Sequence, residues 1–450
     1  MSTKETDPLL PLAEDILKHT QELVKILSAQ SISPPSLAVG ARTELWTTHD
    51  GEIEEKRSQL CVLMQRLDKL VQGPRGFLHE YVSGNWEYGA LYTLLEFDVL
   101  QKIPLRGTAS VETLAEQARL PADKLLRICR LVACVGILEE VEEGVFGHTA
   151  ISEELVNDEG FRSWVGFQLF ETRVASAHLA DALRRPDPFW KGQAAFEHAW
   201  GMPMYAWHAK HPEKGKRFAL AMDSVSKTLD PGNGMITNWL RDQPWTTQSN
   251  TPALVIDIDG KTGSFAKDLA TLFPNLHFEV QDSSPAPLAI GKQTLPQSLS
   301  NRITFRLRDL FTQRTPNEHG SPTSPRVLML RSALWRLDDA GCIQLLQSFI
   351  PLLQHADNPK PILLVNDLVS LEWDPDRGPD ADRPFRRRDV TVMTMHNAKQ
   401  RTAREWAALF AQASARFEVV YSQALSSHSC RGMWLVCWGG GAAGGQDGGM

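Results

Sequence analysis

A change of sequence pattern near residue 250 constrains the fold of this 450-residue chain more than any other feature. From there on, short apolar runs of strand length alternate with runs of helical length. These runs cover residues 253–256, 265–273, 277–280, 303–307, 327–330, 343–353 and 362–365. Alternation of this kind is typical of βαβ units, in which a helix connects successive parallel strands. We therefore predict an α/β fold, with a parallel sheet covered by helices on both faces, from about residue 250 onward.

The N-terminal part is predicted to be helical. Residues 9–27 and 53–71 carry leucines at helical spacing on either side of a Ser/Pro-rich linker at residues 31–36. Further helices are expected at 161–183 and 212–226. Residues 1–75 are assigned to a helical extension, 76–185 to the next domain, and 439–450 to a Gly-rich tail that we expect to be disordered.

The second domain has the pattern of a winged helix. Ser110 is a suitable N-cap for a helix over 111–118, and Pro121 opens a helix that runs to Val135. Residues 137–141 and 145–148 then alternate around Gly144, as the two strands of a hairpin do. The helix that would read DNA, 124–135, is largely apolar, so the pattern favours packing or dimerisation over DNA binding.

Composition excludes several classes of protein. A net charge of -7 argues against a general nucleic-acid binder, which needs a clustered basic excess. Arg383 and the run Arg386-Arg387-Arg388 follow an Asp-rich stretch, which predicts a solvated loop with balanced charges. No apolar run approaches the ~18 residues of a membrane span, and the N-terminus lacks the pattern of a secretory signal.

The six cysteines show no CxxC pairing. Their apolar neighbours indicate reduced core thiols in a cytoplasmic protein, and we expect no zinc or other metal site. The cysteines are Cys61, Cys129, Cys134, Cys342, Cys430 and Cys437.

Ordered motifs along residues 85–435 resemble the plant- and fungal-type small-molecule O-methyltransferases, especially fungal enzymes of secondary metabolism. The resemblance is carried by Phe146-Gly147-His148-Thr149, His211-Pro212-Glu213, Val255-Ile256-Asp257, Phe278 to Asp282, Arg308 to Phe311, Leu330-Arg331 and Asn397 to Thr402 with Glu405-Trp406. It implies a helical dimerisation domain, a homodimer, and a Rossmann-like α/β methyltransferase domain with a helical pocket segment over residues 186–438. S-adenosylmethionine would lie across the carboxyl ends of the strands.

The family's cofactor turn is only partly kept. The pattern there is an acidic residue followed by three glycines at alternate positions, which let the backbone approach the cofactor. This chain keeps Asp257, Gly260 and Gly263, but Asp259 and Lys261 replace the first two alternating glycines. A side chain and a charge then stand where backbone should meet the methionine moiety, so binding of S-adenosylmethionine stays open.

Two further acidic residues match cofactor positions. The resemblance places Asp282 at the ribose hydroxyls and Asp309 at the adenine. Each has a second interpretation, because each could simply cap the following helix.

The catalytic position departs from the family as well. Active relatives carry a histidine base a few residues after the Leu-Arg pair, with an acidic residue beside it. Here Trp335 and Arg336 occupy these places, and neither side chain can act as a base. Glu405 matches the glutamate that supports this histidine, and His396 is too distant along the chain to be assigned as a substitute.

The missing base favours a non-methylating reaction. Relatives of this family include cyclases, so we predict a dehydration or pericyclic cyclisation, of Alder-ene or Diels–Alder type, of a polyketide or polyketide–amino-acid intermediate. Arg336 would stabilise a carbonyl electrostatically and Trp335 would form a stacking wall. Arg336 as a surface arginine beside Asp338 or Asp339 is an equally open interpretation.

Two other functions remain open: an S-adenosylmethionine-dependent O-methyltransferase for a polyketide or aromatic hydroxyl, and a non-catalytic regulatory partner. The wall of a pocket for a hydrophobic small molecule is predicted from residues 167–171, 200–207, 222–223 and 393–397, with no nucleic-acid or membrane partner. Its members are Phe167, Glu171, Met222, Asp223, Met393, His396 and Asn397.

Overall fold

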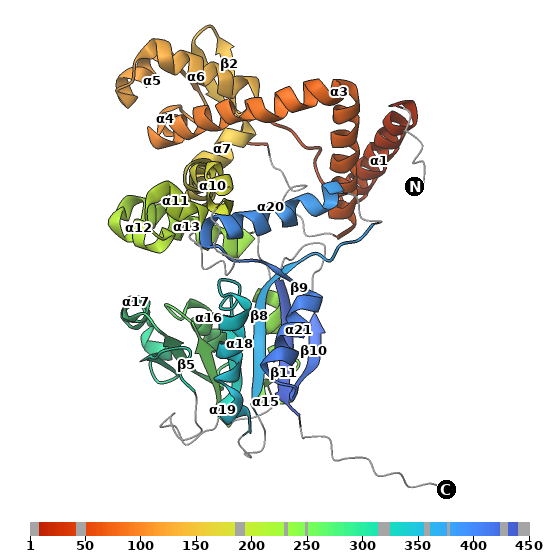
Figure 1. Cartoon of the computed structure of the whole chain (residues 1–450). Helices are drawn as coiled ribbons and strands as arrows, with labels where there is room; N and C mark the ends of the chain where they lie inside the picture. The colour runs from red at the N-terminus through yellow and green to blue at the C-terminus, as the bar shows by residue number, and fades with distance from the viewer. Residues whose placement is uncertain are drawn as a thin grey trace. The chain divides into compact units, whose positions relative to one another are not determined.

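The computed structural model describes residues 9–41, 51–184, 194–228, 233–247, 251–313, 325–354, 361–375, 379–423 and 431–439. The chain forms two compact units, which we describe separately. The N-terminal unit comprises Met1–Val174 and Tyr205–Val225, and the C-terminal unit comprises Ala175–Met204 and Ser226–Met450. Figure 1 labels their helices and strands. The predicted Gly-rich tail lies outside the described residues from 440 onward.

The N-terminal unit begins with two helices that pack on each other, α1 (Leu9–Ala29) and α3 (Gly51–Glu96). Leu23, Leu27 and Ile53 form the centre of their contact. Helix α3 bends at Gly73, whose φ of 69° is not helical, and its two halves run in different directions (Figure 1). Pro74 follows, and a proline is tolerated at the start of a helical segment because it lacks an N–H to donate.

A winged helix follows and confirms the predicted hairpin. It contains α4 (Val99–Lys102), β1 (Thr108–Ser110), α5 (Val111–Ala118), α6 (Ala122–Cys134), β2 (Leu138–Glu142) and β3 (Val145–His148), with strand order β1-β3-β2. Ser110 caps α5 by accepting a hydrogen bond from the Thr113 N–H. Thr149 and Ser152 form a capping box at the start of α7 (Ala150–Asn157).

The predicted helix over residues 161–183 is interrupted. It is divided into α8 (Glu159–Phe167), a π-helical turn η1 (Gln168–Thr172), α9 (Arg173–Ala177) and α10 (Leu179–Leu183). A π turn inserts one extra residue into the helical ladder and shifts the faces that follow. Helices α11 (Ala195–Trp200), α12 (Met204–Lys210) and α13 (Pro212–Thr228) come next along the chain.

The C-terminal unit is built on a sheet with strand order β10-β11-β8-β7-β4-β5-β6. Its strands are β4 (Ala253–Ile258), β5 (Leu276–Asp282), β6 (Ile303–Leu307), β7 (Pro325–Arg331), β8 (Ile362–Ser370), β10 (Phe417–Gln423) and β11 (Arg431–Trp438), and a short β9 (Arg401–Thr402) pairs with β8. The pairs among β4 to β8 are parallel, which confirms the predicted α/β class. Strand β11 is antiparallel to both β8 and β10, which the alternation of runs did not predict.

Helices cover both faces of this sheet. On β4, Leu254, Ile256 and Ile258 pack with α18 (Asp339–Gln347), α19 (Ile350–Gln354) and α21 (Ala403–Ala413). Ala253 and Val255 pack with α14 (Asn233–Arg241), α16 (Ser264–Leu272) and α17 (Pro285–Gln293). Side chains alternate across a strand, so burial of both faces requires the continuous apolar runs seen in the sequence.

Two sequence expectations are wrong. The arginines at 383 and 386–388 belong to a helix, α20 (Pro379–His396), and not to a loop. Of the five described cysteines, all free, Cys129 and Cys342 are buried, but Cys61 and Cys134 are exposed. Apolar neighbours therefore misplaced these two thiols, since each lies on a helix that buries only one face. Cys430 lies outside the described residues. No described helix is long and apolar enough to cross a membrane.

Candidate functional site

The order of the strands marks a topological switch point in the C-terminal unit. The chain runs from β4 through β5 to β6 on one side and then returns to place β7 on the other side of β4. Ligands of doubly wound sheets bind at such a switch point, outside the carboxyl ends of the strands. The turn after β4 and the turn after β7 both lie at this edge, because the two strands are parallel.

The turn after β4 keeps the backbone of a glycine turn without all of its glycines. Asp259, Lys261 and Gly263 have φ values of 61°, 54° and 64°. All three alternate positions are thus left-handed, a conformation that normally favours glycine. At Gly260, a Cβ would lie 2.6 Å from the Asp257 carboxylate oxygen, so this position needs glycine for lack of space.

Three carboxylates gather around this turn. Asp257 at the end of β4 is buried, and burial raises its pKa to about 7, with Arg331 opposing the rise and Asp259 adding to it. Burial also raises the pKa of Asp259, against the nearby charges of Arg336 and Lys261. Asp282 at the end of β5 is buried as well and accepts the Lys261 N–H at 3.2 Å.

Asp282 also accepts the Ser284 N–H at 2.7 Å, just before α17. Asp309 is exposed, and its Oδ1 accepts the Phe311 N–H at 3.0 Å. Neither acid caps a helix, because Asp309 precedes a non-helical turn and the N-cap position of α17 is Ser284. For Asp282, the N–H groups of Lys261 and Ser284 fix the orientation of the carboxylate near the switch point.

An ion pair connects the two turns. Nη2 of Arg336 lies 2.7 Å from Oδ2 of Asp259, and the two side chains are 30% and 3% exposed. That oxygen is buried and has no aligned hydrogen-bond donor in the described part of the chain. Arg336 and Asp259 are two of the positions at which the sequence departs from the family pattern, and the structure places them in contact. Arg336 thus pairs with an acid from the turn after β4.

Trp335 is held in a defined orientation. The buried Asp367 on β8 accepts the N–H groups of Leu334 and Trp335 at 2.8 and 3.2 Å. The indole N–H donates to the Ser332 carbonyl at 3.1 Å. The ring meets His396 edge to face, with 5.1 Å between centroids. The predicted stacking residue and the predicted pocket histidine are therefore neighbours.

Glu405 has structural roles at the start of α21. Its carboxylate accepts the Thr402 N–H at 2.9 Å in a capping box and forms an ion pair with Lys399 at 3.1 Å. Asn397 has a φ of 52° and ends α20, while Met393 is half-buried on that helix. The catalytic role of Glu405 and the pocket role of the two others stay predictions.

The remaining predicted pocket residues belong to the N-terminal unit. Glu171, fully buried on the π turn, forms an ion pair with Arg217 at 2.6 Å, and its other oxygen lies 3.9 Å from Nε2 of the buried His208. Phe167 packs against His208 with centroids 6.4 Å apart. Met222 is half-buried and Asp223 is exposed.

Sequence reasoning missed Asp367, Arg217 and His208. Asp367 had a signal, because it is the one acid inside the apolar run of β8. The predicted pocket stretch from residue 200 to 207 ended one residue before His208. Arg217 belongs to a segment that resembles the family, but only the folded structure brings α13 to the π turn.

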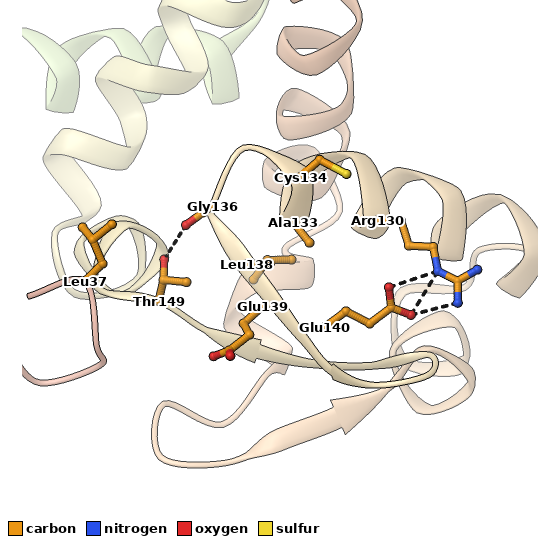
Figure 2. A pocket seen from close by; sticks show the side chains of 9 residues that line it. All are labelled: Leu37, Arg130, Ala133, Cys134, Gly136, Leu138, Glu139, Glu140 and Thr149. Carbon is orange, nitrogen blue, oxygen red and sulfur yellow. Dashed lines mark hydrogen bonds and ion pairs between the residues drawn. The ribbon is translucent and has the colours of Figure 1, made fainter. Parts of the chain in front are cut away.

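The wing carries a hollow that the sequence did not predict. Its volume is about 580 Å³, and Figure 2 shows its lining. Arg130 donates to Glu140 on one side, and the Thr149 hydroxyl donates to the Gly136 carbonyl on the other. The other lining residues are Leu37, Ala133, Cys134, Leu138 and Glu139. No group of three or more metal-binding side chains occurs in the described ranges.

A doubly wound sheet with a left-handed turn and an acid at its switch point is the architecture of a Rossmann-like cofactor-binding domain. Comparison with known families makes this class specific. The family model described as O-methyltransferase domain matches residues 177–416. The chain belongs to the O-methyltransferase family.

Individual relatives agree with this assignment. The chain is 54% identical to O-methyltransferase phnC of Penicillium herquei over 92% of this chain and 97% of the relative. It is 29% identical to O-methyltransferase sol2 of Alternaria solani, over 93% of each.

Solved structures share the fold at low identity. OxaC, in complex with SAH and oxaline, superposes with a TM-score of 0.69 at 17% identity, over 95% of this chain and 100% of that chain. The mitomycin 7-O-methyltransferase MmcR does so with a TM-score of 0.63 at 20% identity, over 81% and 97%.

Proposed function

We propose that this protein is an S-adenosylmethionine-dependent O-methyltransferase of secondary metabolism that acts on an acidic aromatic hydroxyl of a polyketide. The observation that carries the proposal is the turn after β4. Its three alternate positions keep left-handed φ values although two of them are no longer glycine. A turn that keeps its strained backbone after two glycines have been replaced is more consistent with a retained binding role than with a loss of function. The 54% identity to a protein named O-methyltransferase supports the same reaction.

The residues at the crevice fit this cofactor. Asp282 is positioned to accept from ribose hydroxyls, and Asp257 and Gly260 shape the backbone that would meet the cofactor. The buried carboxylate of Asp259 suits a positively charged group, and in the absence of a ligand this group is Arg336 at 2.7 Å. When bound, S-adenosylmethionine supplies an electrophilic methyl group, and the chain has to bind and orient the acceptor oxygen.

The substrate class follows from the missing base. Trp335 carries no basic nitrogen, and its indole N–H is engaged with Ser332. A phenol acidic enough to ionise near neutral pH needs no enzyme base, and its methylation then depends on orientation alone. We propose such phenols as acceptors.

A non-methylating dehydration or cyclisation is the second candidate, and the absence of a base favours it. It was the first choice from the sequence, but the relatives support methyl transfer better. The structure also weakens its electrophile, because the positive charge of Arg336 is neutralised by Asp259 at 2.7 Å. If this candidate is correct, the wild-type protein converts the polyketide in the absence of any cofactor, and Arg336→Ala abolishes this turnover.

The test is a methyl-transfer assay with labelled S-adenosylmethionine and a series of hydroxyarenes of graded acidity. The products are identified by mass spectrometry. We expect turnover to rise with the acidity of the phenol, and its pH profile to follow the ionisation of the phenol itself. Trp335→His should restore a base and raise turnover of the least acidic phenols by about 10²-fold or more. Trp335→Phe is the matched control, since it replaces the indole without adding a base.

Two results would contradict the proposal. Dehydrated or isomeric products formed without the cofactor would establish the cyclase instead. Failure of wild type and Trp335→His alike to methylate any member of the series would favour a non-catalytic partner.

A homodimer is part of this proposal. The second half of α3 exposes an apolar stripe whose members, at helical spacing, are 59 to 71% exposed: Leu78, Tyr81, Val82 and Trp86. Contiguous exposed apolar surface of this kind marks interaction sites. A second copy of the chain is the partner that the family resemblance suggests.

A further inference from the structure

The ion pair between Asp259 and Arg336 spans the crevice at the switch point of the sheet. Asp259 follows β4 and Arg336 follows β7, the two strands between which the chain changes direction. A ligand in this crevice therefore meets both charges. Asp282, the acid proposed for the ribose, follows β5 on the other side of β4, so the ion pair lies toward the opposite end of the site.

The pair is poorly explained as a device for stability alone. Burial of an ion pair costs solvation that the attraction of the two charges seldom exceeds, unless additional hydrogen bonds satisfy both groups. Here the buried Asp259 oxygen faces Arg336 at 2.7 Å, and no further donor among the described residues is aligned with it. Asp259 also holds a left-handed φ of 61°, so the carboxylate is kept in place at a cost in backbone strain.

The two charges have the arrangement that recognises an α-amino acid. A carboxylate accepts from an ammonium group, and a guanidinium donates to a carboxylate in a bidentate manner. With a separation of 2.7 Å, the two groups neutralise each other in the absence of a ligand. A ligand with an adjacent ammonium and carboxylate replaces each partner with one of the same sign, which keeps both buried charges paired.

We propose that Asp259 and Arg336 form a zwitterion clamp for the amino-acid end of S-adenosylmethionine, an inference that rests on the proposed function. Asp259 binds the ammonium group, and Arg336 turns from Asp259 to bind the carboxylate. The clamp accounts for two departures from the family pattern together. Asp259 stands where the family has a glycine, and Arg336 stands where it has an acid. In this proposal, side chains bind the amino-acid end of the cofactor at the place where the glycines of the family pattern would offer backbone.

The test compares two nucleosides that differ at this end. S-adenosylmethionine has the amino-acid group, whereas 5′-deoxy-5′-methylthioadenosine has the adenosine and the sulfur without it. Calorimetric titration of the full chain would be done with wild type, Asp259→Asn and Arg336→Gln. Loss of one charge-assisted contact should weaken S-adenosylmethionine about 10-fold or more, and leave the affinity for methylthioadenosine within about 2-fold of wild type.

Methylthioadenosine binding also reports whether each variant is folded. Arg336→Lys keeps the charge but cannot bind a carboxylate in a bidentate manner, so we expect an intermediate affinity for S-adenosylmethionine. This variant replaces Arg336→Gln if the latter is unstable. Arg130→Gln, which breaks an ion pair of the N-terminal unit with Glu140 at 3.0 Å, is the matched control and should change neither affinity.

Three outcomes overturn the clamp. Equal weakening of both nucleosides would assign the pair a structural role, and tighter binding of both would show that it blocks the site. An affinity for S-adenosylmethionine that neither substitution changes would contradict the clamp but not the proposed function. A wild-type protein that binds neither nucleoside contradicts the proposed function and the clamp with it.

Discussion

The buried Asp257 makes the stability of the free protein depend on pH in a direction that can be worked out. Its pKa is raised from 3.8 to about 7, first by burial and then by the neighbouring Asp259. Between these two values the folded protein holds a proton that the unfolded chain has lost. Stability therefore falls as pH rises from about 4 to about 7, and stays at the lower level above that.

The magnitude follows from the two pKa values. One pKa unit corresponds to about 1.4 kcal/mol, so the charge on Asp257 costs about 4 kcal/mol once it is fully formed. Asp257→Asn has nearly the same shape and no charge to form. The variant should thus exceed wild type in free energy of unfolding, and this excess should grow by about 2 kcal/mol between about pH 5.5 and about pH 8.

Urea unfolding of the ligand-free protein at the two pH values measures this difference. The control is Asp123→Asn, an exposed carboxylate on α6, for which we expect no growth of the difference. An Asp257→Asn curve that parallels wild type at both pH values would refute the reasoning. It would mean that Arg331 and Lys261 stabilise the carboxylate as much as burial destabilises it.

The backbone strain in the turn after β4 predicts opposite effects at two positions. Lys261→Gly should raise the free energy of unfolding by up to about 1 kcal/mol, because glycine relieves a φ of 54°. Gly263→Ala should lower it by about 1–2 kcal/mol, because its φ is 64° and the new Cβ would lie 3.0 Å from the Phe305 ring; equal effects of the two changes would argue against the strain. In light scattering, Trp86→Asp should shift the proposed dimer toward monomer, whereas Trp373→Asp, at a tryptophan 81% exposed in the other unit, should not. A mass that is the same for all three proteins would place the interface elsewhere.

The sequence by itself determined the architecture of both units. Apolar runs of β4, β5, β7 and β8 alternate with helical runs because a sheet buried on both faces needs continuous apolar strands. Ser110, Thr149 and Gly144 fixed the ends of the wing elements, since caps and tight turns depend on neighbouring residues only. Strands β10 and β11 were missed although both carry apolar residues, because alternation with helices gives no indication of an antiparallel hairpin at the edge of the sheet.

Only the tertiary structure decided the chemistry of the candidate site. Sequence analysis identified Asp259 and Arg336 as separate departures from the family, and the ion pair between them exists because β7 returns beside β4. In the same way, Trp335 meets His396, and Glu171 meets Arg217, across elements that are distant along the chain. Secondary structure depends on residues that are close along the chain, whereas the pairing of buried charges depends on the order of the strands. This is why the sequence could name the residues of the site but not their partners.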